Sequence, residues 1–337
     1  MRLSRRLAFA SVTAVAVAVA GWGGAWFAAA RTVEHGIRDW AETQRAHGVD
    51  VRFAALTMEG FPFAVRAVAT DGAIATRAVQ WQGTKVVAEA AIWSPSSIAL
   101  TLPGPQRLTI DNGAGTTRLE APAGHGRVLL GADGQPVDAT LTFADVTVAP
   151  AVPHSAPARV RTLSLTMTQP GQPPVDPQAT GLTMALSADG ITLPPEAAAL
   201  GPAMERAEAT VRVQGRPPAP EPASLSAWSN NGGTVELDRL AVNWGPVRLS
   251  VNGTFALDRQ LQPEAAMTME VRGAQQALTA VSAMLKPKEV NIARTVLAML
   301  SRPAEDGEPV VTAPVTIQSR ALYVGPMKVA AMPEVVW

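Results

Sequence analysis

The chain has 337 residues, of which 47% are hydrophobic and 17% charged, and its 28 basic and 28 acidic side chains cancel to a formal net charge of +0. A balanced charge gives no positive field to attract nucleic acid, so no nucleic-acid partner is expected. Cysteine is absent, which excludes disulfides and thiolate chemistry. A chain of this length is long enough to bury a sizeable core.

The first element is an uncharged stretch, Leu7–Ala30, that follows Arg2, Arg5 and Arg6. As a helix rising ~1.5 Å per residue it would measure roughly 36 Å, enough to cross a hydrocarbon core of ~30 Å. Because basic residues collect on the cytoplasmic side of a membrane, residues 1–6 are expected in the cytoplasm. We therefore predict a transmembrane signal-anchor helix at 7–30 and export of everything that follows.

The alternative for this stretch is a cleavable signal peptide. The small residues before Arg31 resemble a cleavage site. Against cleavage, the apolar run exceeds the usual ~7–15 residues of a signal peptide, and Trp22 and Trp26 suit an outer interfacial belt. Both interpretations export the rest of the chain.

A second helical pattern covers residues 31–48. Val33, Ile37, Trp40 and Ala41 recur at helical spacing with charged residues between them, and Gly48 is placed to end the helix. This pattern predicts a stalk helix that docks one face on the region after it.

From Val49 onward the hydrophobic period changes to two, which is typical of antiparallel strands with one buried and one wet face. The alternation is clearest at 97–102, 163–168, 207–214 and 247–258. We predict a mainly β (α+β) fold, namely a large curved antiparallel sheet or a sandwich. Four dipeptides are expected to form hairpin turns: Asp71-Gly72, Asn112-Gly113, Asp133-Gly134 and Asp189-Gly190.

Proline clusters divide this β-region, because proline cannot pair in the middle of a sheet. They lie at 150–157, 170–177 and 217–222 and predict edge loops or linkers. A short helix is expected at Pro195–Ala207, and a helical pair near the C-terminus. The predicted order after the stalk is a first β half at 49–216, a Pro-rich loop at 217–223, and a second β half at 224–337 with the helical pair at 274–301.

The sequence carries no recognisable catalytic constellation. The four histidines are scattered without a second ligand at metal-binding spacing, and no nucleophile elbow, Walker sequence or dinucleotide loop is present. Glu208, Asp258 and Glu270 fall on the polar phase of strands or in turns, as solvated residues do. We therefore predict a protein that is not an enzyme, with no catalytic residue, no cofactor and no metal.

The apolar phase of the strands is more suggestive, because methionine is flexible and fills irregular apolar space. A long, Ala-rich sheet with few aromatics could curl around more volume than its own side chains fill. The simpler interpretation is an ordinary packed core. The residues expected to line an apolar groove are Met184, Leu249, Val251, Phe255, Met267, Met269 and Met327.

Several ordered motifs carry a resemblance to a known family. The stalk ends in Asp39-Trp40 and Arg45-Ala46-His47-Gly48. The further motifs, with the residues expected to have structural roles, are Gly60-Phe61-Pro62-Phe63, Val87-Ala88-Glu89-Ala90, Trp93-Ser94-Pro95, Leu102-Pro103-Gly104, Asn243-Trp244-Gly245-Pro246 and Tyr323-Val324-Gly325-Pro326. Phe61 and Phe63 are expected to be apolar plugs, and Trp81, Trp93 and Trp244 to anchor the sheet.

With these motifs the chain resembles a bacterial family known as domain of unknown function 2125, although Ser94 stands where that family often has Asn. The resemblance implies a membrane-anchored envelope protein without an established activity. Together with the predicted anchor, this places the chain in the bacterial inner membrane, single-pass, with a periplasmic C-terminal domain. More loosely, the chain resembles AsmA-like envelope proteins, which are associated with lipid handling. Two functions follow as expectations: binding or passing membrane lipid or another apolar envelope component in a β-groove, or a periplasmic scaffold that recruits envelope proteins.

Overall fold

The computed structural model describes residues 2–111, 115–149, 155–219, 221–282, 287–303 and 308–335. The side chains of residues 2–20, 287–289, 292, 293, 296 and 299 are outside this description. Strands make up 56% of the chain and belong to one large antiparallel sheet. The mainly β class is confirmed, and the sheet is single rather than a sandwich of two.

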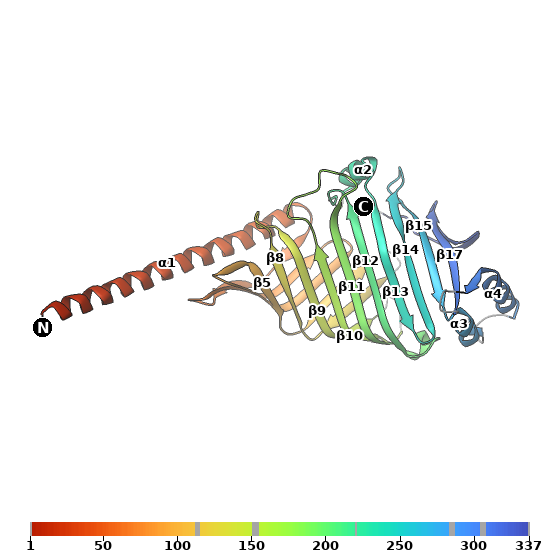
Figure 1. Ribbon diagram of the computed structural model, residues 1–337, viewed down its shortest axis with the longest axis horizontal. Helices are drawn as coiled ribbons and strands as arrows, with labels where there is room; N and C mark the ends of the chain where they lie inside the picture. The colour runs from red at the N-terminus through yellow and green to blue at the C-terminus, as the bar shows by residue number, and fades with distance from the viewer. Residues whose placement is uncertain are drawn as a thin grey trace.

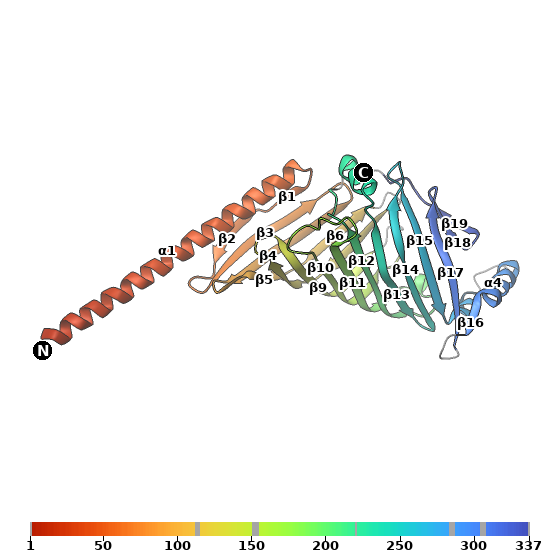
Figure 2. The same ribbon diagram turned by 45° about the horizontal axis from the view of Figure 1, so that its top comes forward.

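The chain begins with one continuous helix, α1 (Arg2–Ala46). Its C-terminal part lies along β1 (Asp50–Arg52), β2 (Ala55–Glu59) and β3 (Ala64–Ala75), while its N-terminal part runs away from the sheet (Figures 1 and 2). The predicted stalk region is the C-terminal part of this helix, which contacts β1–β3 and ends before Gly48, whose φ is 81°. The buried face runs through Trp26, Ala30 and Ala41, not through Val33 and Trp40, which are exposed.

The predicted anchor at 7–30 falls largely on residues whose side chains are outside the description. Within the part of the chain that the structure describes, no helix combines the length and the apolar character that crossing a membrane requires.

The strands after β3 form an antiparallel meander in which two long strands are each interrupted once. One half of β4 pairs with β5 and the other half with β6, so the break at Pro103–Pro105 divides a single long strand. The same holds for β7 and β8, which both pair with β9. The bounds are β4 (Val79–Ala91), β5 (Ser94–Leu102), β6 (Gln106–Asp111), β7 (Thr116–Ala121), β8 (Gly124–Leu130) and β9 (Pro136–Ala149).

The meander continues without a topological break across the Pro-rich loop, because β12 pairs directly with β13. The later strands are β10 (Ala158–Thr168), β11 (Thr180–Thr192), β12 (Ala203–Gln214), β13 (Val235–Trp244), β14 (Val247–Leu257), β15 (Pro263–Arg272), β16 (Ser301–Pro303), β17 (Pro309–Gln318), β18 (Ala321–Val324) and β19 (Met327–Ala331). The helices are α2 (Pro222–Asn230), α3 (Ala274–Val281) and α4 (Pro287–Leu300). The last two lie at the end of the molecule opposite α1 (Figure 1).

Two of the predicted hairpin turns are wrong. Asp133-Gly134 does join β8 to β9, and Asn112-Gly113 lies outside the described residues. Asp71-Gly72 and Asp189-Gly190, however, lie inside β3 and β11. Asp71 has φ 49° and Gly190 has φ 64°, so each supplies the left-handed residue of an irregularity within a strand rather than of a chain reversal.

The helix predicted at Pro195–Ala207 is also wrong. Only Pro195–Ala197 is helical, as a single 3-10 turn, and β12 begins at Ala203. The proline at its first position starts a turn, but the alternation of β12 against β11 and β13 takes over within a few residues.

The interruptions of strand pairing form a line across the sheet. The pairing is interrupted at Asp145, Arg161 and Gly190 on the neighbouring strands β9, β10 and β11, and shifts again on β12 next to Met204. Because interruptions of this kind bend strands and increase their twist, the sheet coils, and β3, β4 and β6 come to lie behind β9–β12 (Figure 1). A cluster of buried residues follows the same line: Ala121, Val146, Val160 and Ile191.

Candidate functional site: the apolar face of the sheet

One face of the sheet is apolar from strand to strand. Residues that stand opposite one another in register share a face, so the pairing alone defines rows of side chains across the sheet. One such row is Val65, Ala90, Ile98, Val128, Ala139, Met167, Met184, Val211, Leu237, Gly253, Met267, Val315, Val324 and Met327. We call the side to which this row belongs the apolar face. The row runs from β3 to β19 without a polar member.

The residues predicted to line a groove all fall on this face. Met184, Met267 and Met327 are members of the row above, although Met327 is on the exposed edge strand β19. The neighbouring rows hold the other four, because Leu249 pairs with Val271, Val251 with Met269, and Phe255 with Ala265. The structure therefore brings together on β14 and β15 the five residues that were predicted there, with Met184 three strands away on β11.

The apolar face is concave where the sheet coils. Trp81 on β4 and Leu163 on β10 are several strands apart in the sheet, yet both line one small cavity of about 80 Å³. The other lining residues are Gln106, Leu108, Leu119, Glu120, Ala121, Phe143 and Val146. Binding pockets for small molecules typically measure roughly 300–1,000 Å³, so this cavity by itself is too small for a lipid. Any larger apolar ligand would have to lie along the open face.

That face is open over the middle strands. Met184 is 36% exposed and Leu186 is 44% exposed, although both belong to the apolar rows of β11. A large apolar side chain left in water forgoes roughly 1.5–3 kcal/mol relative to burial. Exposed apolar surface of this kind is typical of an interaction site, so this part of the face is the candidate functional site.

Glycines keep the concave region tight, and this signal was not used in the sequence prediction. A Cβ added to Gly83 would collide with the Trp81 ring, and one added to Gly124 would collide with Phe143. Gly72 also faces the Trp81 ring. The large side chains of this region therefore lie across glycines of the same strand or of an adjacent strand, which allows the sheet to coil closely.

The residue that sequence reasoning missed most clearly is Gln106. It is buried on the otherwise apolar face, and its Nε2 donates a hydrogen bond to the Gly104 carbonyl at 3.1 Å. Within the described part of the chain, its Oε1 has no hydrogen-bond partner. Gln106 is therefore an acceptor placed at the wall of the small apolar cavity.

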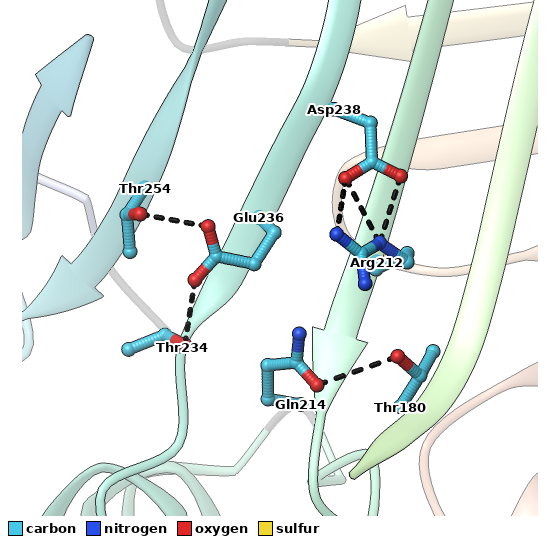
Figure 3. A network of polar contacts seen from close by, with 7 residues as sticks. All are labelled: Thr180, Arg212, Gln214, Thr234, Glu236, Asp238 and Thr254. Carbon is cyan, nitrogen blue, oxygen red and sulfur yellow. Dashed lines mark hydrogen bonds and ion pairs between the residues drawn. The ribbon is translucent and has the colours of Figure 1, made fainter. Parts of the chain in front are cut away.

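The opposite face carries charged side chains, and several of them pair across neighbouring strands. Figure 3 shows Arg212 on β12 making a two-pronged contact with Asp238 on β13, with N–O distances of 2.6–2.8 Å. Beside it, Glu236 accepts hydrogen bonds from the hydroxyls of Thr234 at 3.2 Å and Thr254 at 2.7 Å. Hydrogen bonding to Asp238 raises the pKa of Arg212, so this pair stays charged.

Similar pairs occur along the whole polar face. Arg206 contacts Asp189 at 2.7 Å, Arg239 contacts Glu208 at 2.8 Å, and the pKa of Arg206 is raised by its bond to Asp189. Glu270 is exposed and Asp258 accepts backbone N–H groups in its turn, as predicted for solvated acidic residues. Among the described residues, no group of His, Asp and Glu has the arrangement of a metal site.

The family motifs are at the ends of strands, and three of their aromatic residues are more exposed than predicted. Phe61 and Phe63, expected to be plugs, project from the turn between β2 and β3, and Trp93 projects from the turn before β5. The expectation that they fill the interior is wrong, because they belong to hairpin tips and stay more than half exposed, even though the Phe61 ring contacts those of Trp26 and Phe27 on α1. Gly60 (φ 98°) and Pro62 shape the first turn, and Pro95 lies near the start of β5.

The C-terminal motifs shape turns. Trp244 donates a hydrogen bond from Nε1 to the Gly201 carbonyl at 2.7 Å, which fits the predicted anchoring role. Gly245 and Pro246 form the turn into β14, where Gly245 has φ 54° and its Cα faces the Leu200 carbonyl too closely for a Cβ. Gly325 and Pro326 form the corresponding turn between β18 and β19, and Gly325 donates to the Pro314 carbonyl at 2.8 Å.

Comparison with known proteins agrees with these motifs. A family model described as an uncharacterized protein conserved in bacteria (DUF2125) matches residues 26–333. Comparison with curated proteins gave no match, and neither did comparison with solved structures. Because the match spans nearly the whole chain, the protein belongs to the DUF2125 family of bacterial proteins.

Proposed function

We propose that this protein is a non-catalytic, membrane-anchored envelope protein that holds or passes lipid, or another apolar envelope component, along the apolar face of its sheet. The observation that carries the proposal is the unbroken apolar row from β3 to β19, with its member Met184 and the neighbouring Leu186 open to solvent on β11. In this proposal residues 7–30 cross the bacterial inner membrane once, and the sheet lies in the periplasm.

The energetics favour an elongated apolar ligand over a compact polar one. Each methylene group removed from water contributes about 0.8 kcal/mol, so an acyl chain lying across several strands would bind through many small increments. Met167 and Met184 are directly opposite each other in register and can adapt their shape to such a chain. The polar face suits such a chain less well, because it carries charged side chains, several of which are paired across neighbouring strands.

The membrane anchor is supported by the continuity of α1 with the docked stalk. The helix runs from Arg2 to Ala46 without interruption, and its C-terminal part is fixed to β1–β3. A topology reporter fused after residue 337 tests the orientation. We expect it to face the periplasm, and a reporter facing the cytosol would contradict the anchor and the location together.

The lipid proposal is tested by native mass spectrometry of the full chain purified from membranes. We expect the wild-type protein to retain lipid. Leu186→Glu places a carboxylate on the open apolar face and should abolish retention, whereas Ala185→Glu changes the adjacent residue, which points to the polar face, and should leave it intact. Retention that is absent in the wild type, or equal in both variants, would contradict the proposal.

A second candidate function is a periplasmic scaffold that recruits other envelope proteins. One observation favours it: residues of two of the three proline clusters, 170–177 and 217–222, line a cleft of about 760 Å³ beside Trp228 of α2, with Pro174, Pro177, Pro217 and Pro218 among the lining residues. Proline-rich segments are common protein-recognition elements. Crosslinking in cells with and without residues 217–222 tests this function, and unchanged recovery of partners would count against these loops.

A further inference from the structure

Five aromatic side chains are exposed where α1 leaves the sheet. They are Trp22 (45% exposed) and Phe27 (60%) on the helix, Phe61 (52%) and Phe63 (63%) in the turn between β2 and β3, and Trp93 (73%) in the turn between β4 and β5. We call this group the aromatic collar. Figure 2 shows these strand ends beside the helix at the point where it projects from the sheet.

The members of the collar are close to one another. The rings of Phe27 and Phe61 are stacked with centroids 6.4 Å apart, and both rings contact that of Trp26 edge-on. The turn that carries Trp93 is joined to the turn that carries Phe63, because the amide of Ile92 donates to the Phe63 carbonyl at 3.1 Å. The collar is therefore one surface built from three segments.

Two hydrogen bonds hold the strand ends at a definite level along the helix. Trp22 donates from Nε1 to the Pro62 carbonyl at 2.9 Å, and the buried Trp26 donates to the Ala64 carbonyl at 2.7 Å. Wherever residues 22–26 of the helix lie relative to a membrane, the tips of β2 and β3 must lie at the same depth.

The length of the apolar stretch sets that depth. A helix needs about 20 residues to cross the hydrocarbon core, so a span that begins at Leu7 ends near residue 26. Trp22 and Phe27 would then be at the outer interface, where tryptophan and other amphipathic aromatics are favoured. The tips, which are fixed to this part of the helix, would reach the interface with it.

The charge distribution is compatible with immersion. Residues 60–64 and 91–98, which form the two tips, include no charged side chain. The nearest arginine, Arg66, pairs with Glu89 at 2.6 Å and lies 4.0 Å from Glu59, so it is neutralised on the polar face. Burial of the tips in the headgroup region would desolvate aromatic rings and not unpaired charges.

We infer that the aromatic collar inserts into the outer leaflet of the membrane that residues 7–30 cross. This inference rests on the anchor of the proposed function. It also gives the apolar face a connection to the bilayer, because Val65 and Ala90, the first members of the long apolar row, directly adjoin the two tips. Lipid leaving the outer leaflet would meet the beginning of that row.

The absence of cysteine makes single-cysteine labelling of the full chain a clean test. We would label Phe63→Cys and Trp93→Cys with an environment-sensitive fluorophore in vesicles of phosphatidylethanolamine with a minority of phosphatidylglycerol. Val175→Cys, in a fully exposed loop position, is the aqueous control, and Ala14→Cys in the middle of the apolar stretch reports on the anchor. Quenching by spin-labelled lipids is the readout.

We expect the labels at positions 14, 63 and 93 to be quenched several-fold more than the label at position 175, with deeper quenching at 14. If position 14 is quenched but 63 and 93 behave like 175, the collar does not insert, while the anchor stands. If position 14 is also unquenched, the anchor fails and the collar inference falls with it. Circular dichroism of each variant verifies that the sheet is intact.

Discussion

Strands β11 and β17 present the same apolar face of the same sheet, yet one is open and the other is covered. On β11, Met184 and Leu186 are exposed to more than a third of their area, whereas on β17 Ala313, Val315 and Ile317 are 1%, 7% and 8% exposed. Helix α4 contacts β17, and among the described residues no helix has comparable contact with β11. Alternation in a sequence thus defines which face is apolar, but not whether anything covers it.

The same apolar residue types therefore have different roles on the covered and on the open part of the face. Where the face is covered, its residues stabilise the fold, because their burial removes apolar area from water. Where it is open, the same residue types contribute little to stability and remain available to a ligand. Substitutions at the two places should therefore have opposite consequences for stability and for lipid retention.

The largest effect should come from placing a charge on the covered part. We expect Ala313→Asp to reduce the free energy of unfolding by roughly 3–5 kcal/mol, because the carboxylate has no partner at a fully buried site. Leu186→Asp, on the open part, should cost about 1 kcal/mol or less. Urea unfolding followed by circular dichroism measures both. Equal losses would show that β11 is covered too.

The docked helix offers the same contrast on a smaller scale. Trp26 is buried and Trp22 is half-exposed, although each donates one hydrogen bond to the turn between β2 and β3. Trp26→Phe should destabilise the docking of the helix by about 1–3 kcal/mol, since it leaves the Ala64 carbonyl without its hydrogen-bond donor. Trp22→Phe should have a smaller effect, because water can take the place of the Trp22 indole as the donor to the Pro62 carbonyl. Hydrogen exchange at the buried Ala41 measures docking, and stronger loss in Trp22→Phe would reverse this assignment.

The two faces can also be compared through their buried glutamines. Gln214 Oε1 accepts a hydrogen bond from the Thr180 hydroxyl at 3.4 Å, whereas Gln106 Oε1 has no partner among the described residues. Gln214→Leu should lower the free energy of unfolding by about 1 kcal/mol. Gln106→Leu should change it by about zero, because removing the unsatisfied Gln106 Oε1 offsets the loss of the hydrogen bond from Gln106 Nε2 to the Gly104 carbonyl. A large loss in Gln106→Leu by thermal unfolding would mean that this oxygen is satisfied by a bound group.

The smallest effect concerns an exposed carboxylate. Hydrogen bonds from its own backbone and from the Ala156 amide lower the pKa of Glu196, and Glu196 Oε1 lies 2.7 Å from that amide. Since the folded pKa is below the unfolded one, this bond contributes fully above the unfolded pKa and is lost as pH falls through the folded value. Exchange protection at Ala156 should fall in that window, while Ala179, bonded to a carbonyl, stays constant.

Much of the site could be predicted from single strands. Because the side-chain period of a strand is two, the positions of Leu249, Val251 and Met269 on one face followed from alternation alone. Joining strands into a row required only that they be antiparallel neighbours. Met184 and Met267, more than eighty residues apart, lie in the same row for this reason.

The bends could not be predicted in this way. An Asp-Gly pair favours a left-handed residue both in a hairpin and in a bulge, so Asp133-Gly134 and Asp189-Gly190 have the same local chemistry and different outcomes. The choice depends on whether the flanking strand has a continuous partner. Exposure of Phe61, Phe63 and Trp93 was missed for a related reason, since a hairpin tip is apolar in sequence whether or not another element covers it.

Two adjacent residues of β11 provide the most direct test of the open apolar face. A photo-crosslinking amino acid at Met184 points to the apolar face, and one at Ala185 points to the polar face. We predict that irradiation of cells attaches phospholipid to the protein labelled at 184 but not to the protein labelled at 185. Lipid at neither position, or at both equally, would contradict the account.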